Sequence, residues 1–256
     1  MFTDLPASPP PVSRHIALIA AGGQGLRMGS STPKQYSLLA GEAILRHVVR
    51  AFRRAAAIDL IAVVVAPDDP RADKTLADFV SPGFDDPSAG GIGRVEPDRV
   101  IILRSGGASR RDSVLGGLRA LQKLHWGLRD DDRVLVHDAA RPGILSAEID
   151  AMIQALADDP VGGLLGLPVA DTTKRVQNGR VVRTESRENL WLAQTPQLFV
   201  ASKLVQALER HPEVSDEALA MELEGWSPQI LEGNRRNLKV TTPQDLAWLE
   251  RIWKEQ

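Results

Sequence analysis

The feature that most constrains this chain is a glycine-dense turn that directly follows an apolar run. The run spans residues 15–19, HIALI, and the turn spans residues 20–29, AAGGQGLRMG. An uninterrupted apolar run of this length predicts a strand buried on both faces, as in a parallel sheet covered by helices. Glycines at the end of such a strand let another group approach the backbone N–H groups closely. The turn is therefore a candidate phosphate-binding loop.

The spelling of the turn excludes two common nucleotide-binding loops. A P-loop ends in Gly-Lys-Ser/Thr, whereas Lys34 here follows proline and precedes glutamine. A dinucleotide-binding fingerprint that starts at Gly23 requires a small residue where Met28 stands. The structural alternative is an ordinary strand-to-helix turn with solvated Arg27 and Lys34. The glycines alone fit that alternative, but their combination with both cations favours a cradle for a triphosphate.

Composition excludes several function classes. The 256 residues are 43% hydrophobic, which is enough for a substantial core in one large α/β domain or two small ones. A net charge of −2 argues against a nucleic-acid-binding surface, which usually carries a basic excess. The chain has no cysteine, so it has neither disulfides nor a thiolate nucleophile. Because the chain has no overall basic excess, we expect its positive charges to act at individual binding sites.

The beginning of the chain lacks a targeting pattern. Residues 1–13 contain four prolines and neither a basic start nor an apolar core, so we expect a flexible leader before a single domain over residues 14–256. No run approaches the ~20 apolar residues of a membrane span. These observations predict a cytoplasmic protein that binds neither membrane nor nucleic acid.

The apolar patterns alternate between strand and helix spacing along most of the chain. Strands are expected at 60–65, 100–103, 133–138, 162–169 and 229–233, and helices at 43–52, 146–156, 198–208 and 216–223. Ser146, Ser215 and Thr242 are the expected caps of the helices that follow them. Alternation of this kind predicts an α/β fold with a mostly parallel sheet.

Two further polar segments follow predicted strands. A second glycine turn, RSGGASRRDS at 104–113, follows the strand at 100–103 and leads into a helix that Ser109 or Asp112 could cap. Asp138 ends the strand at 133–138 and could hold Mg²⁺, orient a sugar hydroxyl, or cap the next turn. Ligands of open parallel sheets bind beyond the carboxyl ends of the strands, so both glycine turns can flank one nucleotide.

One segment breaks the alternation. Residues 172–185 carry an Asn178-Gly179 turn between strand-like flanks, which is a strong hairpin pattern. The hairpin has few apolar residues, among them Val176 and Val181, and so cannot form a core of its own. We therefore expect a protruding arm at about 170–188 that lies on another surface, for which a second copy of the chain is an economical candidate.

Several motifs in this order resemble the 2-C-methyl-D-erythritol 4-phosphate cytidylyltransferase family. They are AAGGQGLRM (20–28), PKQY (33–36), GGASRRDSV (106–114), VHDAARP (136–142), DTTK (171–174), TPQ (195–197), SDEA (215–218) and NLKVT (237–241). The first motif is shared by sugar nucleotidyltransferases, whereas the whole set is far more specific. The resemblance implies a Rossmann-like three-layer sandwich and a homodimer joined through the arm.

The resemblance also implies a reaction: CTP and methylerythritol phosphate give the CDP-alcohol and pyrophosphate, with Mg²⁺ or another divalent cation. It assigns residues to three roles. Catalytic residues would be Arg27, Lys34, Arg187 and Lys239. Nucleotide-binding residues would be Ala20, Ala21, Gly22, Gly23, Gly25, Gly107, Ser113 and Asp138. Substrate-binding residues would be Arg141, Thr172 and Thr195, and Mg²⁺ would be held mainly by the CTP phosphates, with Asp138 as a possible ligand.

Two features depart from the family pattern, and two alternative functions remain. The loop at 81–98 is longer than expected, and the proline-rich leader is additional. Some relatives carry a fused cyclase domain, for which we expect no residues here. The nearest alternative is the same chemistry on another alcohol phosphate, such as ribitol 5-phosphate. The other is a non-catalytic nucleotide-binding module, which would have no need for three cations in these motifs.

Overall fold

The computed structural model describes residues 13–23, 32–80, 99–124 and 127–254. Residues 1–12 of the expected leader, the loop at 81–98 and the site residues Gly25 and Arg27 lie outside the described residues. Among the described residues, no helix has the length and apolar character needed to cross a membrane.

The described chain is organised around a sheet of seven strands in the order β11-β7-β10-β6-β1-β4-β5. Their bounds are β1 His15–Ala20, β4 Leu60–Val64, β5 Arg99–Leu103, β6 Arg133–Asp138, β7 Gly162–Pro168, β10 Trp191–Val200 and β11 Gln229–Glu232. β10 runs antiparallel to both of its neighbours, and the other pairings are parallel. The predicted α/β fold with a mostly parallel sheet is confirmed.

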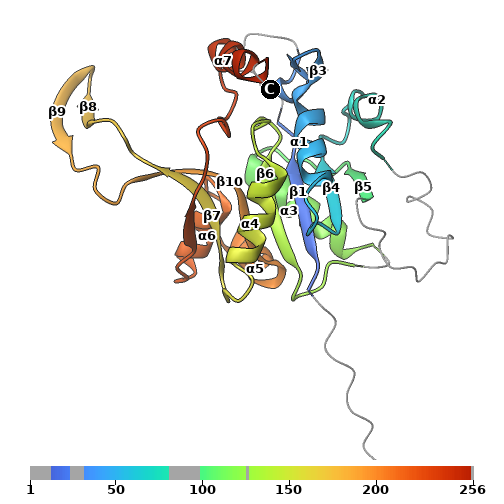
Figure 1. Cartoon of the computed structure of the whole chain (residues 1–256). Helices are drawn as coiled ribbons and strands as arrows, with labels where there is room; N and C mark the ends of the chain where they lie inside the picture. The colour runs from blue at the N-terminus through green and yellow to red at the C-terminus, as the bar shows by residue number, and fades with distance from the viewer. Residues whose placement is uncertain (1–12, 24–31, 81–98, 125–126, 255–256) are drawn as a thin grey trace, which may run out of the picture.

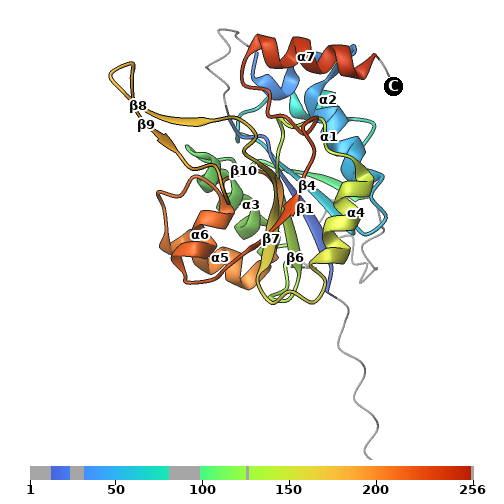
Figure 2. The ribbon, with the colours of Figure 1, turned by 60° about the vertical axis from the view of Figure 1, so that its left-hand side comes forward.

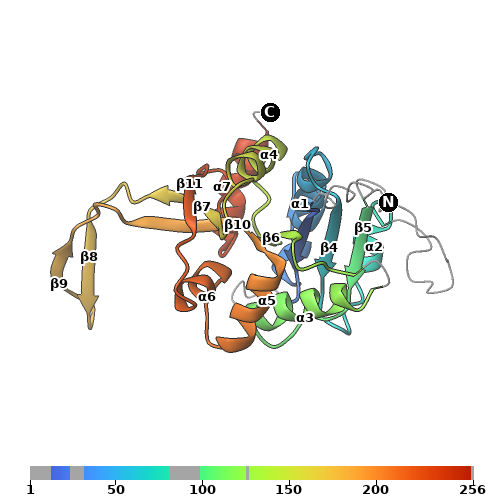
Figure 3. The same cartoon turned by 90° about the horizontal axis from the view of Figure 1, so that it is seen from below.

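Helices cover both faces of this sheet and produce three layers (Figures 1 and 3). One face carries α1 Ile44–Arg53, α2 Ala72–Leu76 and α4 Ser146–Ala155. The other carries α3 Arg110–Gln122, α5 Ala201–Arg210 and α6 Glu217–Leu223. The last helix, α7 Pro243–Trp253, packs on the small hairpin of β2 Leu38–Leu39 and β3 Glu42–Ala43, which follows the 3-10 helix Lys34–Tyr36.

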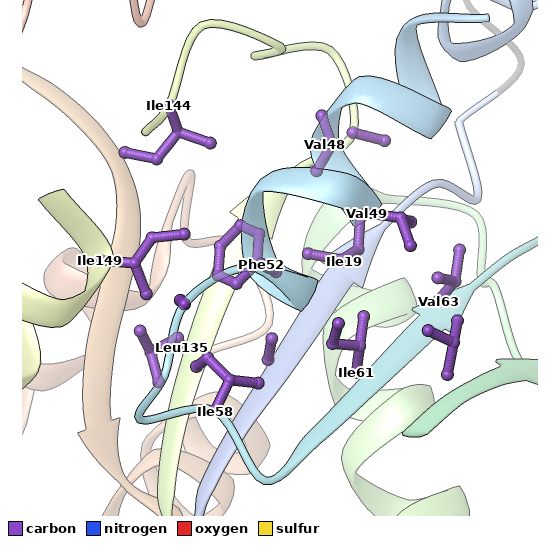
Figure 4. Close-up of a cluster of buried hydrophobic side chains, with 14 of the residues drawn as sticks. Ile19, Val48, Val49, Phe52, Ile58, Ile61, Val63, Leu135, Ile144 and Ile149 are labelled. Atoms are coloured by element: carbon purple, nitrogen blue, oxygen red, sulfur yellow. The ribbon is translucent and has the colours of Figure 1, made fainter. Parts of the chain in front are cut away.

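Helix α1 shows how the apolar pattern positions these layers. Ile44, Val48 and Phe52 recur at helical spacing and are fully buried, whereas Arg53 on the same helix is exposed. The ring of Phe52 lies among side chains of β6, α4 and the loop before β4 (Figure 4). Burial of one such side chain contributes about 1.5–3 kcal/mol to the free energy of unfolding.

The strand register brings the polar ends of the strands to one edge. Ala20 of β1 lies beside Val64 of β4 and beside Asp138 of β6. The glycine turn after β1, the loop after β4 and the carboxylate at the end of β6 therefore start from the same level of the sheet. This carboxyl edge is where ligands bind in open parallel sheets.

The predicted hairpin forms an arm of two strands, β8 Thr173–Gln177 and β9 Arg180–Glu185. It projects from the junction of β7 and β10, away from the helical layers (Figures 1 and 3). Asn178 and Gly179 form the turn with φ of 50° and 75°, which glycine and asparagine tolerate best. Val176 and Val181 are 56% and 62% exposed, so the arm leaves its apolar side chains uncovered in the single chain.

Three local predictions were wrong. Residues 198–200 belong to β10 rather than to a helix, because Leu198 and Phe199 pair with β6 and are buried on opposite faces. Ser146 is the first residue of α4 and does not cap it; Leu145 occupies the cap, and its N–H is bonded by Glu148. Asp216, not Ser215, caps α6 by accepting the N–H of Leu219. The Thr242 cap of α7 is confirmed.

Replacement of Phe52 by alanine is expected to lower the free energy of unfolding by about 3–5 kcal/mol, because the ring fills a closed core and leaves a cavity. Leu223→Ala, at a position 55% exposed, is the matched control and should change it by less than about 0.5 kcal/mol. Urea unfolding of both variants measures the difference, and equal losses would contradict this account of the core.

Candidate active site

A cavity of about 720 Å³ opens at the carboxyl edge of the sheet. It brings together the two glycine turns and two of the predicted cations, which are far apart in the chain. The residues that line it are Ala20, Ala21, Gly22, Gly23, Lys34, Gln35, Ala66, Pro67, Asp68, Gly106, Gly107, Ala108, Ser109, Arg110, Ser113, Asp138, Ala139, Ala140, Lys239 and Thr241. A volume of this size fits a nucleotide-sized ligand.

The second glycine turn is held against the start of α3 by a closed set of hydrogen bonds. Ser109 accepts the N–H of Asp112 at 3.0 Å, and the Asp112 carboxylate accepts the N–H of Ser109 at 3.3 Å. The Ser113 hydroxyl accepts the N–H of Gly107 at 3.1 Å. A Cβ at Gly107 would lie 2.5 Å from that of Asp112, so only glycine permits this approach. Of the two predicted caps, Ser109 is the one that caps α3, and Asp112 completes the capping box.

The first glycine turn is positioned by a glutamine that the sequence analysis did not assign. The buried side chain of Gln35 donates to the carbonyl oxygens of Ala21 at 2.8 Å and Gly23 at 3.2 Å. These two bonds fix the start of the turn relative to the 3-10 helix that begins at Lys34. The carbonyl oxygens of Ala21 and Gly23 are thereby satisfied within the protein.

A cluster of alternating charges forms the floor of the cavity. The Asp138 carboxylate contacts Arg110 Nε at 2.7 Å, Lys239 Nζ at 2.8 Å and Arg141 Nε at 3.6 Å. Arg110 also makes a two-pronged pair with Glu217, at 2.7 and 2.9 Å. Three cations face two carboxyl groups, so the cluster carries excess positive charge whichever protonation state Glu217 takes.

Burial has opposite outcomes for the two carboxyl groups of this cluster. Burial favours the neutral form of Asp138, yet Arg110 and Lys239 outweigh it and hold the pKa of that carboxyl far below its ordinary value. Burial raises the pKa of Glu217, and the pairing with Arg110 works against that rise. Asp138 is therefore ionised at neutral pH and keeps the ammonium group of Lys239 at the wall of the cavity.

A chain of neutral hydrogen bonds lies beneath Asp138. The Thr195 hydroxyl accepts the N–H of Asp138 at 3.1 Å and lies 3.0 Å from His137 Nδ1. His137 Nε2 lies 3.1 Å from the carbonyl oxygen of Arg141, which can only accept, so the Nε2 atom carries the proton. Nδ1 then accepts from Thr195. Burial lowers the pKa of His137 to about 4, which keeps the imidazole neutral.

The segment before Lys239 is fixed in the same way. The buried side chain of Asn237 donates to the carbonyl oxygen of Thr195 at 2.7 Å, and the backbone carbonyl oxygen of Asn237 accepts from Arg141 at 2.8 Å. These bonds tie the 237–241 segment to β10 and to the residues after β6. The backbone that carries Lys239 to the cavity is therefore held both by β10 and by the residues that follow β6.

Comparison with known proteins identifies this arrangement. A family model described as IspD, 2-C-methyl-D-erythritol 4-phosphate cytidylyltransferase, matches residues 15–255. The chain belongs to this family. It is accordingly a nucleotidyltransferase of the cytidylyltransferase type, which confirms the predicted family and enzyme class.

Individual relatives agree over nearly the whole length. The 2-C-methyl-D-erythritol 4-phosphate cytidylyltransferase of Paraburkholderia phytofirmans is 45% identical, with 94% of this chain and 96% of that protein covered. The enzyme of the same name from Nitrosomonas eutropha is 42% identical, with 95% and 98% covered. A crystal structure of a 4-diphosphocytidyl-2C-methyl-D-erythritol synthase has 35% identity and a TM-score of 0.78, covering 94% of this chain and 99% of that one.

The structure brings most of the predicted site residues of this cytidylyltransferase together. All the predicted residues of the first glycine turn that are described line the cavity, as do Lys34, Gly107, Ser113, Asp138 and Lys239. Thr195 and Arg141 lie beneath it and bond to backbone groups. Thr172 and Arg187 are exposed on the arm and its base and do not line the cavity. Arg110 and Glu217 lie within the motifs GGASRRDSV and SDEA, but no role is predicted for either from the sequence.

A low-pH stability test examines the neutral state of His137. The unfolded chain takes up a proton near pH 6.5 that the folded chain takes up only near pH 4, so stability should fall as the pH drops through this window. The contribution reaches about 3 kcal/mol by pH 4. His137→Gln should flatten the pH dependence of the free energy of unfolding, measured in urea between pH 7 and pH 4.5. Parallel curves for the two proteins would contradict a depressed pKa.

Proposed function

We propose that this chain transfers a cytidylyl group from CTP to 2-C-methyl-D-erythritol 4-phosphate at the cavity described above. A phosphate oxygen of the acceptor would form a bond to the α-phosphorus of CTP. The bond from that phosphorus to the β-phosphate oxygen would break, and pyrophosphate would leave with the bonding electrons. The observation that carries the proposal is the cavity between two glycine turns, with Lys34 and Lys239 on its walls and full-length membership of the family.

The chemistry requires alignment and positive charge rather than a base. The acceptor phosphate is ionised at neutral pH, so no proton must be removed from the nucleophile. The charge that builds on the α-phosphate and on the leaving pyrophosphate is stabilised by cations and by backbone N–H groups. We assign that role to Lys34 and, from its place in the motif, to Arg27.

We assign the acceptor phosphate to Lys239 and Arg187. Lys239 lies at the cavity wall with its ammonium group on Asp138, and its side chain is 39% exposed. Arg187 and Thr172 lie on the exposed arm and do not reach the cavity of their own chain in this arrangement. The uncovered apolar residues of the arm support a homodimer in which each arm completes the site of the other subunit.

We assign Mg²⁺ to the phosphates of CTP. Among the described residues, no group of three potential ligands could hold a metal ion. Both oxygens of Asp138 already face cations, Arg110 on one and Lys239 on the other, so the carboxylate fits poorly as a direct ligand. The metal would supply charge neutralisation to the triphosphate when it enters with the nucleotide. We place the enzyme in the cytoplasm, because the absence of cysteine suits a reducing compartment.

An assay of pyrophosphate release tests the proposed reaction. Purified protein with Mg²⁺ is given each of the four nucleoside triphosphates together with methylerythritol phosphate or ribitol 5-phosphate. Release is expected with CTP and methylerythritol phosphate. Release with ribitol phosphate alone would reject the acceptor, and no release with any pair would favour a non-catalytic nucleotide-binding module.

Replacement of Lys34 by alanine is expected to lower kcat by roughly 100-fold or more, because it removes a preorganised cation from the transition state. Lys203→Ala is the matched control, since this lysine lies on α5 against Trp226 and outside the cavity. It should retain normal turnover. Near-normal kcat in a folded Lys34→Ala variant would overturn the assigned role.

Mixing two inactive variants tests whether the arm acts in trans. In a heterodimer of Lys34→Ala and Arg187→Ala subunits, one of the two sites would contain both an intact Lys34 and an intact Arg187 from the other chain. Random exchange should therefore restore roughly a quarter of wild-type activity. No recovery, in a mixture shown by mass to contain heterodimers, would mean that Arg187 serves the site of its own chain.

A further inference from the structure

A second cavity lies where α1, the loop before α4 and the end of α7 meet. Figure 2 shows the arrangement of these three helices. The cavity volume is about 360 Å³, which is within the range of small-molecule sites, roughly 300–1,000 Å³. The walls come from α1, from the loop between β6 and α4, from residue 236 and from the end of α7. None of these lining residues also lines the cavity between the glycine turns.

The lining of this second cavity is basic. Three arginines, Arg50, Arg54 and Arg236, contribute to its wall, and none of its described lining residues is acidic. Arg50 is paired with Glu42 at 2.7 Å, so its charge is partly compensated. The Nε atom of Arg236 is buried and has no hydrogen-bond partner in the described structure. A buried guanidinium nitrogen without a partner costs free energy that an anionic ligand would recover.

The start of α4 adds further donors for an anion. Leu145 and Ser146, at the first turn of this ten-residue helix, both line the cavity. Glu148 lies near Arg236 but accepts the N–H of Leu145 at 2.9 Å. Glu148 thus occupies one donor at this helix end, and the Ser146 hydroxyl is the side-chain donor that can supplement the arginines.

The rest of the lining is largely apolar and aromatic. Trp253 of α7 packs edge-on against His47 of α1, with ring centroids 5.1 Å apart. Pro142 and Ile144 extend this part of the lining. Burial lowers the pKa of His47, so the imidazole is neutral at pH 7 and adds no charge of its own. Its Nε2 atom lies 2.8 Å from the carbonyl oxygen of Leu39 and so carries the ring proton.

We propose that this cavity is a second ligand site, which binds a small phosphorylated molecule whose remaining part is apolar or aromatic. Guanidinium groups present paired N–H donors that match the oxygens of a phosphate. The aromatic wall covers the part of the ligand that carries no charge. The site is distinct from that of the reacting nucleotide, because the two cavities share no lining residue.

The position of this cavity in the chain links it to the reaction. Its loop wall begins at Pro142, directly after Arg141, and a Cβ at Gly143 would collide with the carbonyl oxygen of Arg236. Arg236 precedes Asn237, which accepts from Arg141 and leads to Lys239. A ligand that moves Arg236 therefore moves the backbone that holds Lys239 on Asp138. On this basis the ligand is a regulator, an inference that rests on the proposed function.

Binding of phenyl phosphate, measured by calorimetry, tests the site without using the reaction. The double variant Arg54→Gln/Arg236→Gln should weaken binding by about 10-fold or more, because charged hydrogen bonds are lost. Arg53→Gln is the control for Arg54: it removes one positive charge from the neighbouring residue, whose side chain does not line this cavity. It should change the affinity less than about twofold. Inorganic phosphate should bind more weakly than phenyl phosphate.

A second variant separates this site from the nucleotide cavity. Lys239→Gln should leave the affinity for phenyl phosphate unchanged. Loss of binding in Lys239→Gln together with retention in the double arginine variant would place the phosphate in the active site and overturn the proposal. So would an absence of binding at millimolar concentration. Equal affinity for inorganic phosphate would overturn the apolar part of the assigned ligand.

The regulatory effect of the ligand is tested by enzyme kinetics, separately from its binding. Phenyl phosphate at saturation should change kcat/KM for the acceptor in the wild type and in Arg53→Gln, and should have no such effect in the double arginine variant. Binding without any change in kcat/KM would reject the regulatory link through Arg236, although the cavity would still be a ligand site. Lack of turnover in every protein, with binding intact, would instead reject the proposed reaction.

Discussion

The contact on which this structure most depends is the one between Asp138 and the cations around it. The carboxylate ends β6 and meets Arg110 from the start of α3 and Lys239 from the segment before α7. Arg110 in turn reaches Glu217 at the start of α6. One buried charge thus ties four segments that are distant in the chain. Arg110 and Lys239 contact different oxygens of Asp138, so removal of either would leave this buried carboxylate only partly compensated, which costs more than the loss of an exposed ion pair.

This cluster also explains why the site needs support from groups that never meet a substrate. The ion pair with Asp138 restricts the movement of the Lys239 side chain, so this side chain must already be placed where the substrate phosphate binds. The neutral chain through Thr195 and His137 holds Asp138 in place, and Asn237 holds the backbone of Lys239. Gln35 performs the corresponding task for the first glycine turn. Preorganisation of this kind is what a reaction without a general base requires.

The sequence predicts the parts of the fold that depend on local pattern. Apolar runs marked the buried strands, and the Asn178-Gly179 turn marked the arm. Pairing between distant segments is harder to predict from the sequence. Leu198 and Phe199 fit a helical pattern, yet they pair with β6 in the sheet. The partnership of Arg110 with Glu217 joins residues 107 positions apart, and no spacing rule reveals it. The one sequence signal for these two residues is that each lies in a family motif at the start of a helix. That position could have suggested a place near the cavity.

The direction of β10 has a consequence for how such an enzyme can diversify. Because this strand opposes its neighbours, it starts at the carboxyl edge, where β7 ends, and the arm is inserted between the two. Trp191 pairs with Pro168, and the N–H of Val169 donates to the carbonyl oxygen of Leu190, so the sheet is closed beneath the insertion. The hairpin can therefore change in length and composition while the core stays intact. In the proposed dimer, changes in this one exposed segment would alter subunit contact and acceptor choice together, with little cost to folding.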